Sequence, residues 1–147
     1  MLISDHQIIQ ERFLKALCDL RSTIFDGSPA EDMGLTPALA KALMAVASTT
    51  TGSMCVKELA VALGIKESSA SVLSDRLVQS GQVIKKTHEG DGRVALLVIS
   101  QEGIRLAGSL KAHRLSRATA LLDLLPEAEQ LETVRRLETM SAKENTQ

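Results

Sequence analysis

The sequence predicts a mostly α-helical protein with one small β-hairpin, and three observations lead to this fold class. Six stretches place apolar residues at the three- and four-residue spacing of amphipathic helices. Two apolar, β-branched runs, "QVIKKTH" and "RVALLVIS", flank the turn-forming "EGDG" and indicate a hairpin. The length of 147 residues suits a single domain, which we expect over residues 1–147; the alternative is a small domain plus helices that need a partner.

Two helices come first. The stretch from about Asp5 to Phe25 carries an apolar face made of Ile9, Phe13, Ala16, Leu17, Leu20 and Ile24. The segment "DGSPAEDMG" interrupts the helical pattern. "LTPALAKALMAVAS" then starts a second helix, with Thr36 as its N-cap and Pro37 at the first helical position, where a missing N–H costs nothing.

A pair of short helices follows, and the hairpin comes directly after it. In "CVKELAVALGIKESSASVLSDRLVQSGQ", one apolar face ends at Gly64 and a second at Gly81, where a left-handed C-cap residue is expected. Two short helices joined by a glycine-containing turn indicate a helix-turn-helix. Because a hairpin follows the second helix, the sequence predicts a winged helix-turn-helix over residues 36–100, in which the hairpin is the wing.

The remaining helices have apolar faces that the winged unit does not cover. Helical spacing continues from about Gln101 to Leu125, and Pro126 is expected to open a last helix. A second copy of the chain is the simplest cover for these faces and for that of the first helix. We therefore expect a homodimer held by residues 5–27 and 101–142.

The second helix of the helix-turn-helix has a composition that suits contacts with double-stranded DNA. Its buried side is predicted to hold Ala70, Leu73 and Leu77. Its other sides carry groups for phosphates and base edges: Ser68, Ser69, Ser71, Val72 and Arg76. Val72 suits contact with a thymine methyl group. Lys66 precedes the helix, where a positive charge opposes the helix dipole and becomes favourable beside a phosphate. The alternative is that the serines are plain caps and Lys66 a solvated side chain.

The wing carries a single arginine near its tip. The two glycines of "EGDGR" permit a tight turn, and a slim tip fits the minor groove, where arginine is the usual occupant. We therefore expect Arg93 to contact the minor groove, with Asp91 holding its guanidinium. Lys85 and Lys86 on the first strand are expected to meet phosphates. The alternative is a solvated hairpin arginine.

One family combines these features. The winged region reads "VKELAVALGIKESSASVLSDRLVQSGQVIKKTHEGDGRVALLVISQEG", and its "KELA", Ser71, "DRL", Gly81, "DGR" and "ISQEG" resemble the multiple antibiotic resistance regulator (MarR) family of bacterial winged-helix regulators. "LTPALAKAL" and "LLPEAEQLETVRRL" fit the flanking helices. The resemblance implies a homodimer that binds a pseudo-palindromic operator through the major groove. It also implies repression and a mostly apolar pocket for a small apolar or amphipathic effector.

Some positions depart from that family's pattern. Val72 stands where a basic residue is frequent, and Gly92 stands where an arginine is frequent. Lys66 and Leu125 occupy positions where polar N-caps are common. Because the first two departures remove expected DNA contacts, the operator sequence does not follow from the resemblance.

The cysteines and histidines give no strong site. Cys18 and Cys55 lack CxxC spacing and are expected to be free thiols. We expect Cys18 to be buried as a small hydrophobic residue and Cys55 to stand in place of a polar N-cap. Each is also a candidate redox residue: the resemblance includes a sensing cysteine in the first helix, and N–H groups at a helix start lower a thiol pKa. His6, His88 and His113 show no ligand spacing, so neither a metal nor a cofactor is expected.

Composition limits the other classes of function. An aromatic content of 1% disfavours the binding of single strands by base stacking. The sequence has no nucleophile motif, phosphate-binding glycine loop or paired carboxylates with a base, so we do not expect an enzyme. With a net charge of −1, the main rival is a winged-helix interaction module that has lost DNA binding. No apolar run is long enough to cross a membrane and no secretory signal opens the chain, so we expect a cytoplasmic protein.

Overall fold

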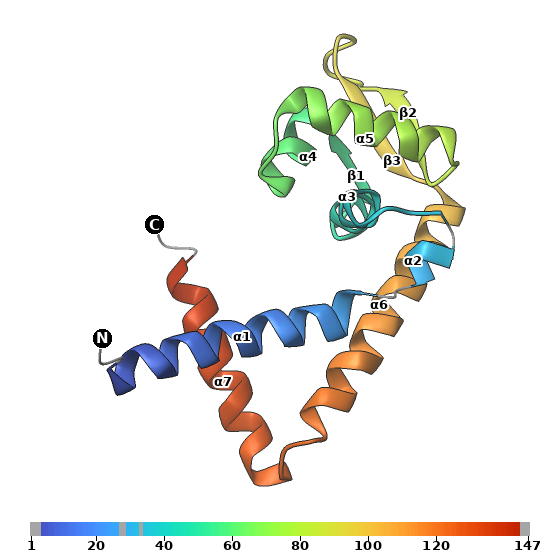
Figure 1. The fold of residues 1–147 in the computed structure, drawn as a ribbon. Coiled ribbons are helices and arrows are strands. Elements are labelled where there is room, and N and C mark those ends of the chain that lie inside the picture. The colour runs from blue at the N-terminus through green and yellow to red at the C-terminus, as the bar shows by residue number, and fades with distance from the viewer. Residues whose placement is uncertain (1–3, 27–28, 33, 145–147) are drawn as a thin grey trace. The chain divides into compact units, whose positions relative to one another are not determined.

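The computed structural model describes residues 4–26, 29–32 and 34–144. Its helices are α1 (Asp5–Phe25), α2 (Pro29–Asp32), α3 (Pro37–Ala47), α4 (Val56–Leu63), α5 (Glu67–Gln79), α6 (Gln101–Leu122) and α7 (Glu127–Glu144). Its strands are β1 (Ser53–Cys55), β2 (Val83–Thr87) and β3 (Ala95–Ile99) (Figure 1). The predicted fold class, mostly helical with a winged helix-turn-helix, is confirmed. The chain forms two compact units, one with α1, α7 and α6 from Arg114 onward, the other running from α2 to His113.

The winged unit packs helices α3, α4 and α5 with a small antiparallel sheet. The strand order is β1-β3-β2, and Leu97 of β3 pairs with Met54 on one side and Lys85 on the other. Leu97 is fully buried, together with the other large core side chains Leu43, Val46, Leu59, Leu77, Val83, Leu106 and Leu110. This core fixes the position of α5 against the wing.

The sheet contains one strand that the sequence pattern does not predict. The sequence indicates a two-stranded hairpin, but β1 pairs with residues 96–98 of β3. Gly52, at φ 67°, accepts a hydrogen bond at its carbonyl from the Ile99 N–H at 2.8 Å and leads the chain into β1. A strand of three residues is too short to show the alternation by which strands are recognised.

The helix boundaries predicted from capping residues are confirmed. The Thr36 hydroxyl accepts a hydrogen bond from the Leu39 N–H at 3.3 Å, and Pro37 is the first residue of α3. Gly64 and Gly81 adopt left-handed φ angles of 64° and 79° after α4 and α5. Glycine adopts the left-handed conformation more readily than any other residue, which explains why a glycine ends each of these helices.

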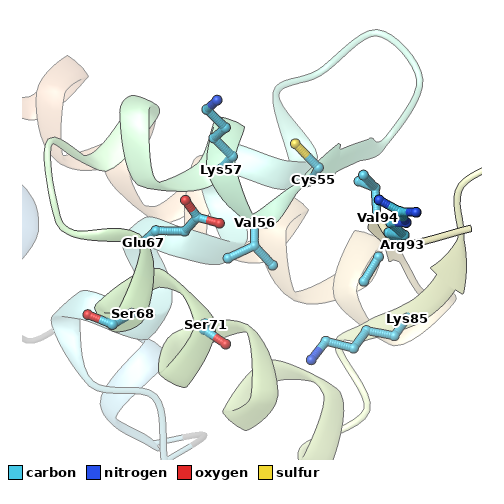
Figure 2. Close-up of a pocket in the computed structure, with 10 residues that line it drawn as sticks. Cys55, Val56, Lys57, Glu67, Ser68, Ser71, Lys85, Arg93 and Val94 are labelled. Atoms are coloured by element: carbon cyan, nitrogen blue, oxygen red, sulfur yellow. The ribbon is translucent and has the colours of Figure 1, made fainter. Parts of the chain in front are cut away.

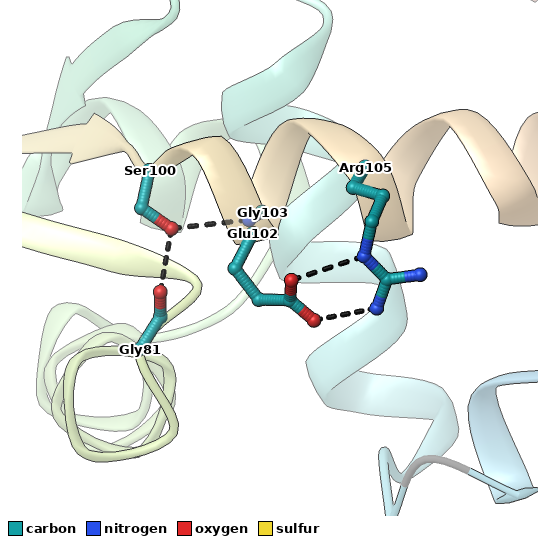
Figure 3. A network of polar contacts seen from close by, with 5 residues as sticks. All are labelled: Gly81, Ser100, Glu102, Gly103 and Arg105. Carbon is teal, nitrogen blue, oxygen red and sulfur yellow. Dashed lines mark hydrogen bonds and ion pairs between the residues drawn. The ribbon is translucent and has the colours of Figure 1, made fainter.

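The end of α5 is fastened to the start of α6. The Ser100 hydroxyl donates to the Gly81 carbonyl at 2.5 Å and accepts from the Gly103 N–H at 3.0 Å (Figure 3). The Ser100 N–H donates to the Gln82 carbonyl at 2.9 Å. Next to this junction, hydrogen bonds from the Arg105 guanidinium lower the pKa of the Glu102 carboxyl below its ordinary value.

The other unit buries no described side chain within a single chain. Its exposed apolar residues are Ile8, Ile9, Phe13, Leu14, Leu17, Leu20, Phe25, Leu115, Leu124, Leu131, Leu137 and Met140. Arg117 donates to the Thr23 carbonyl at 3.1 Å, and the Arg114 guanidinium lies 4.8 Å from the centre of the Phe25 ring. The unit therefore presents long apolar surfaces that its own helices leave exposed.

None of the described helices is long and apolar enough to cross a membrane.

Candidate nucleic-acid interface

Helix α5 turns one face into the core and leaves the opposite face in solvent. Ala70, Ser74 and Leu77 are buried. The exposed residues are Glu67, Ser68, Ser69, Val72, Asp75, Arg76 and Gln79, and Ser71 is half-buried. The predicted orientation of the helix is confirmed, and its DNA contacts stay predictions. Ser74, which the pattern did not place, is accommodated in the core because its hydroxyl donates to the Ser71 carbonyl at 2.8 Å.

The loop at the wing tip is longer than the sequence suggests. It occupies residues 88–94, between β2 and β3. Positive φ angles do not occur at Gly90 or Gly92. A tight turn is present all the same, because the Val94 N–H donates to the Asp91 carbonyl at 3.0 Å and closes a β-turn over residues 91–94 that contains Gly92.

Asp91 shapes the wing tip in a different way from the one predicted. Its Oδ1 accepts a hydrogen bond from the Arg93 backbone N–H at 3.0 Å, which is a local side-chain turn. The carboxylate therefore positions the backbone of Arg93, rather than the guanidinium as the sequence suggested. Arg93 itself is exposed.

A groove of about 640 Å³ lies between α4, α5 and the wing. Ser68 and Ser71 line it from α5, and Lys85 and Arg93 line it from the wing (Figure 2). The structure thus brings together four of the residues predicted to contact DNA. It also adds Lys57, at the start of α4, which sequence reasoning did not single out.

The other predicted contact residues do not line this groove. They are Lys66, Ser69, Val72, Arg76 and Lys86, all exposed. Lys85 and Lys86 are neighbours on β2, and side chains alternate between the two faces of a strand. For this reason the two lysines cannot both point into the groove.

An ion pair links β2 of the wing to α5. The Lys85 ammonium bonds to the Asp75 carboxylate, and the two side chains remain 38% and 53% exposed. Exposed pairs of this kind contribute at most about 1 kcal/mol, so another anion can displace Asp75. Sequence reasoning did not find this pair because ten positions separate its members.

The two cysteines are free thiols, as predicted. Cys18 is exposed in the single chain, so the burial expected for it is not found there. Cys55 is half-buried in the groove wall, where it is the N-cap of α4 and its N–H donates to Glu58 Oε2 at 2.8 Å. Across the described ranges, no group of three or more His, Cys, Asp or Glu side chains is placed to hold a metal ion.

Comparisons with known proteins give structural matches only. No protein-family model matches the sequence, and no curated protein matches it. AbsC, a MarR family transcriptional regulator from Streptomyces coelicolor, is 19% identical, with 100% of this chain and 99% of that chain covered at a TM-score of 0.74. Sco3205, of the same family and organism and solved in complex with DNA, is 18% identical, with coverages of 97% and 89% and a TM-score of 0.72. NadR, solved in complex with 4-hydroxyphenylacetate, is 19% identical, with coverages of 95% and 96% and a TM-score of 0.66.

Proposed function

We propose that this chain, which has the fold of MarR-family transcriptional regulators, is itself a transcriptional regulator that binds double-stranded operator DNA as a homodimer. One observation carries the proposal: hydroxyl groups of α5 and cations of the wing line a single groove. Hydroxyl groups and cationic side chains donate hydrogen bonds, and phosphates and base edges accept them. The shared fold with Sco3205, which was solved with DNA, supports the same function.

Each predicted residue has a place in this proposal. Helix α5 enters the major groove with its exposed residues Ser68, Ser69, Val72 and Arg76 and with the half-buried Ser71. Arg93 at the wing tip reaches the minor groove, where its charge meets an enhanced negative potential. Lys66, Lys85 and Lys86 bind phosphates, which fix the register of the protein on the duplex.

The homodimer is supported by the unit that contains α1 and α7. A folded helical unit that buries no side chain gains little from the hydrophobic effect on its own. A second copy supplies an apolar surface of the same kind, and closed two-fold dimers are the commonest assembly. A two-fold dimer also presents two winged units to two half-sites.

Repression and release by a small apolar or amphipathic effector complete the proposal. They are drawn from the family resemblance, and the complex of NadR with 4-hydroxyphenylacetate supports effector binding within this fold. Cys18 and Cys55 remain the two candidate residues for an oxidant signal.

Replacing Asp75 with asparagine is expected to strengthen binding to unrelated duplexes about two- to fivefold. The change frees Lys85 for phosphates and removes a negative charge from α5. Binding to the operator should gain less, so sequence discrimination decreases. Glu102→Gln is the matched control, because it also removes the carboxylate of an exposed ion pair, outside the groove. Fluorescence anisotropy with operator and unrelated duplexes measures both effects, and equal behaviour of the two variants would contradict the role given to Asp75.

Replacing Arg93 with alanine tests the proposed function. Binding to duplex DNA from the region upstream of the protein's own gene should weaken by about 1–3 kcal/mol, with the slope of log K against log salt reduced by about 1. Arg105→Ala is the control, since it removes the same charge from an exposed position on α6. A wild-type protein that binds no duplex in a salt-dependent way would contradict the proposal and favour the winged-helix interaction module.

A further inference from the structure

We propose that His88 is a positioning residue of the wing: its neutral imidazole holds the loop that presents Arg93 to DNA, and protonation of His88 releases this loop. The inference rests on the proposed DNA-binding function and adds a proton-dependent control to it. It concerns the loop over residues 88–94 and a cavity of about 330 Å³ that this loop lines together with β1 and the start of α4.

Two side-chain hydrogen bonds shape the loop. The Gly90 N–H donates to His88 Nδ1 at 3.0 Å. The Arg93 N–H donates to Asp91 Oδ1 at the same distance of 3.0 Å, so each bond joins a side chain to the backbone two residues further on. At the base of the loop, the His88 N–H donates to the Val94 carbonyl at 2.9 Å. The His88 ring thus orders the first half of the loop, and the Asp91 carboxylate orders the second half.

The bond from Gly90 exists only while the His88 imidazole is neutral. A neutral imidazole has one ring nitrogen that accepts a hydrogen bond, and protonation makes both nitrogens donors. The Gly90 N–H would then face an Nδ1–H group, and the bond is lost. Histidine is the side chain whose charge ordinarily changes between about pH 5 and 8, so mild acid is expected to remove this bond.

The cavity beside the loop contains groups that attract a charged imidazole. His88 lines it together with the carboxylates of Glu58, from α4, and Asp91, from the loop itself. The Cys55 thiol, at the end of β1, also lines it. Four other charged residues near His88 in the sequence lie outside this lining: Lys85, Lys86, Glu89 and Arg93. Two carboxylates in one cavity favour the imidazolium over the neutral ring.

The two halves of the loop are coupled through Asp91. An imidazolium that pairs with this carboxylate competes with the Arg93 N–H, because charge-assisted hydrogen bonds are the stronger ones. One intramolecular hydrogen bond corresponds to roughly a two- to tenfold change in the population of a conformer. Protonation of His88 is therefore expected to reduce the advantage that Arg93 gives to DNA binding. The added positive charge acts separately, because it attracts phosphates with or without Arg93.

Two matched variants separate the hydrogen bond from the charge. His88→Asn places an amide oxygen where Nδ1 stands, so that it accepts from the Gly90 N–H without titrating. His88→Gln carries the same amide group one carbon further out, beyond the reach of this two-residue turn. The wild type should resemble His88→Asn at about pH 7.5 and His88→Gln at about pH 5.5.

The first measurement follows the loop in the full-length protein without DNA. Labelling with ¹⁵N-glycine gives amide resonances for nine glycines, and Gly90→Ala identifies the resonance of Gly90 by its loss. This resonance should shift between about pH 7.5 and 5.5 in the wild type and stay in place in His88→Asn. The resonance of Gly108, on α6, is the internal control. A Gly90 resonance that ignores pH, or that shifts equally in His88→Asn, would overturn the role given to His88.

The second measurement is the loss of duplex affinity caused by Arg93→Ala, read by fluorescence anisotropy with DNA from upstream of the protein's own gene. At about pH 7.5 the loss should be about tenfold in the wild type and in His88→Asn, and about threefold or less in His88→Gln. At about pH 5.5 the wild type should lose no more than His88→Gln, while His88→Asn keeps its larger loss.

The outcomes separate this inference from the proposed function. Salt-dependent duplex binding, with equal losses from Arg93→Ala in all three proteins at both pH values, would overturn the role of His88 and leave the proposed function intact. A protein that binds no duplex at all would overturn both.

Discussion

Replacing Phe13 with glutamate is expected to dissociate the homodimer. Phe13 lies in the apolar face of α1 and is 48% exposed in a single chain. In a two-fold interface the substitution acts twice, and an aromatic anchor contributes about 2 kcal/mol or more. The dimer dissociation constant should therefore rise by roughly a thousandfold, which sedimentation equilibrium measures directly. Helical content should fall with it, because the unit of α1 and α7 has no buried core of its own.

The control for this substitution lies on the same helix. Glu11 is exposed and points about 160° away from Phe13 at helical spacing. Glu11→Lys changes the charge of α1 as well, yet it should leave the protein dimeric. A Phe13→Glu variant that sediments as a dimer would show that α1 does not form the interface.

Replacing Gly103 with alanine is expected to lower the free energy of unfolding by about 3 kcal/mol, the upper part of the usual range for overpacking. A Cβ atom at this position would lie 2.1 Å from the Gln82 carbonyl oxygen and 2.8 Å from Ile99 Cγ1. The backbone between α5 and α6 would have to move, and the hydrogen bonds of Ser100 would be disturbed. Thermal unfolding at a fixed protein concentration measures the loss, as a decrease in Tm of roughly 6–12 °C.

Gly108 provides a matched control five residues further along α6. A Cβ atom there would meet nothing within 4 Å. Gly108→Ala should therefore stabilise the helix by about 0.5–1 kcal/mol, because alanine loses less conformational freedom. Equal destabilisation by both alanine substitutions would contradict the close packing of α6 on Gln82.

Local signals made much of the fold predictable from the sequence. The Thr36–Pro37 pair and the two glycines Gly64 and Gly81 each have a conformational reason to stand at a helix end, and the structure uses them as expected. The spacing of Ala70 and Leu77 also fixed which face of α5 is buried. These features depend only on neighbours within one or two helical turns, so a single sequence contains them.

The features that were missed depend on contacts between distant segments. Strand β1 exists because β3 offers it an edge, and three residues carry no period of their own. The Lys85–Asp75 pair and the place of Lys57 in the groove follow from how α4, α5 and the wing pack together. At the wing tip, the length of the loop and the hydrogen-bond partner of Asp91 were misjudged, because the strands end at Thr87 and begin again at Ala95 and the carboxylate accepts from the Arg93 N–H.

Selection of bound sequences from a pool of random duplexes shows whether a dimer of winged units reads double-stranded DNA. We predict enrichment of an inverted repeat whose half-sites lie about 10 base pairs apart, or a multiple of one helical turn. Thymine should be favoured where Val72 faces the major groove, and Val72→Ala should weaken that preference. Recovery of no common sequence, with no salt-dependent binding to any duplex, would show that this protein does not read DNA as a dimer of winged units.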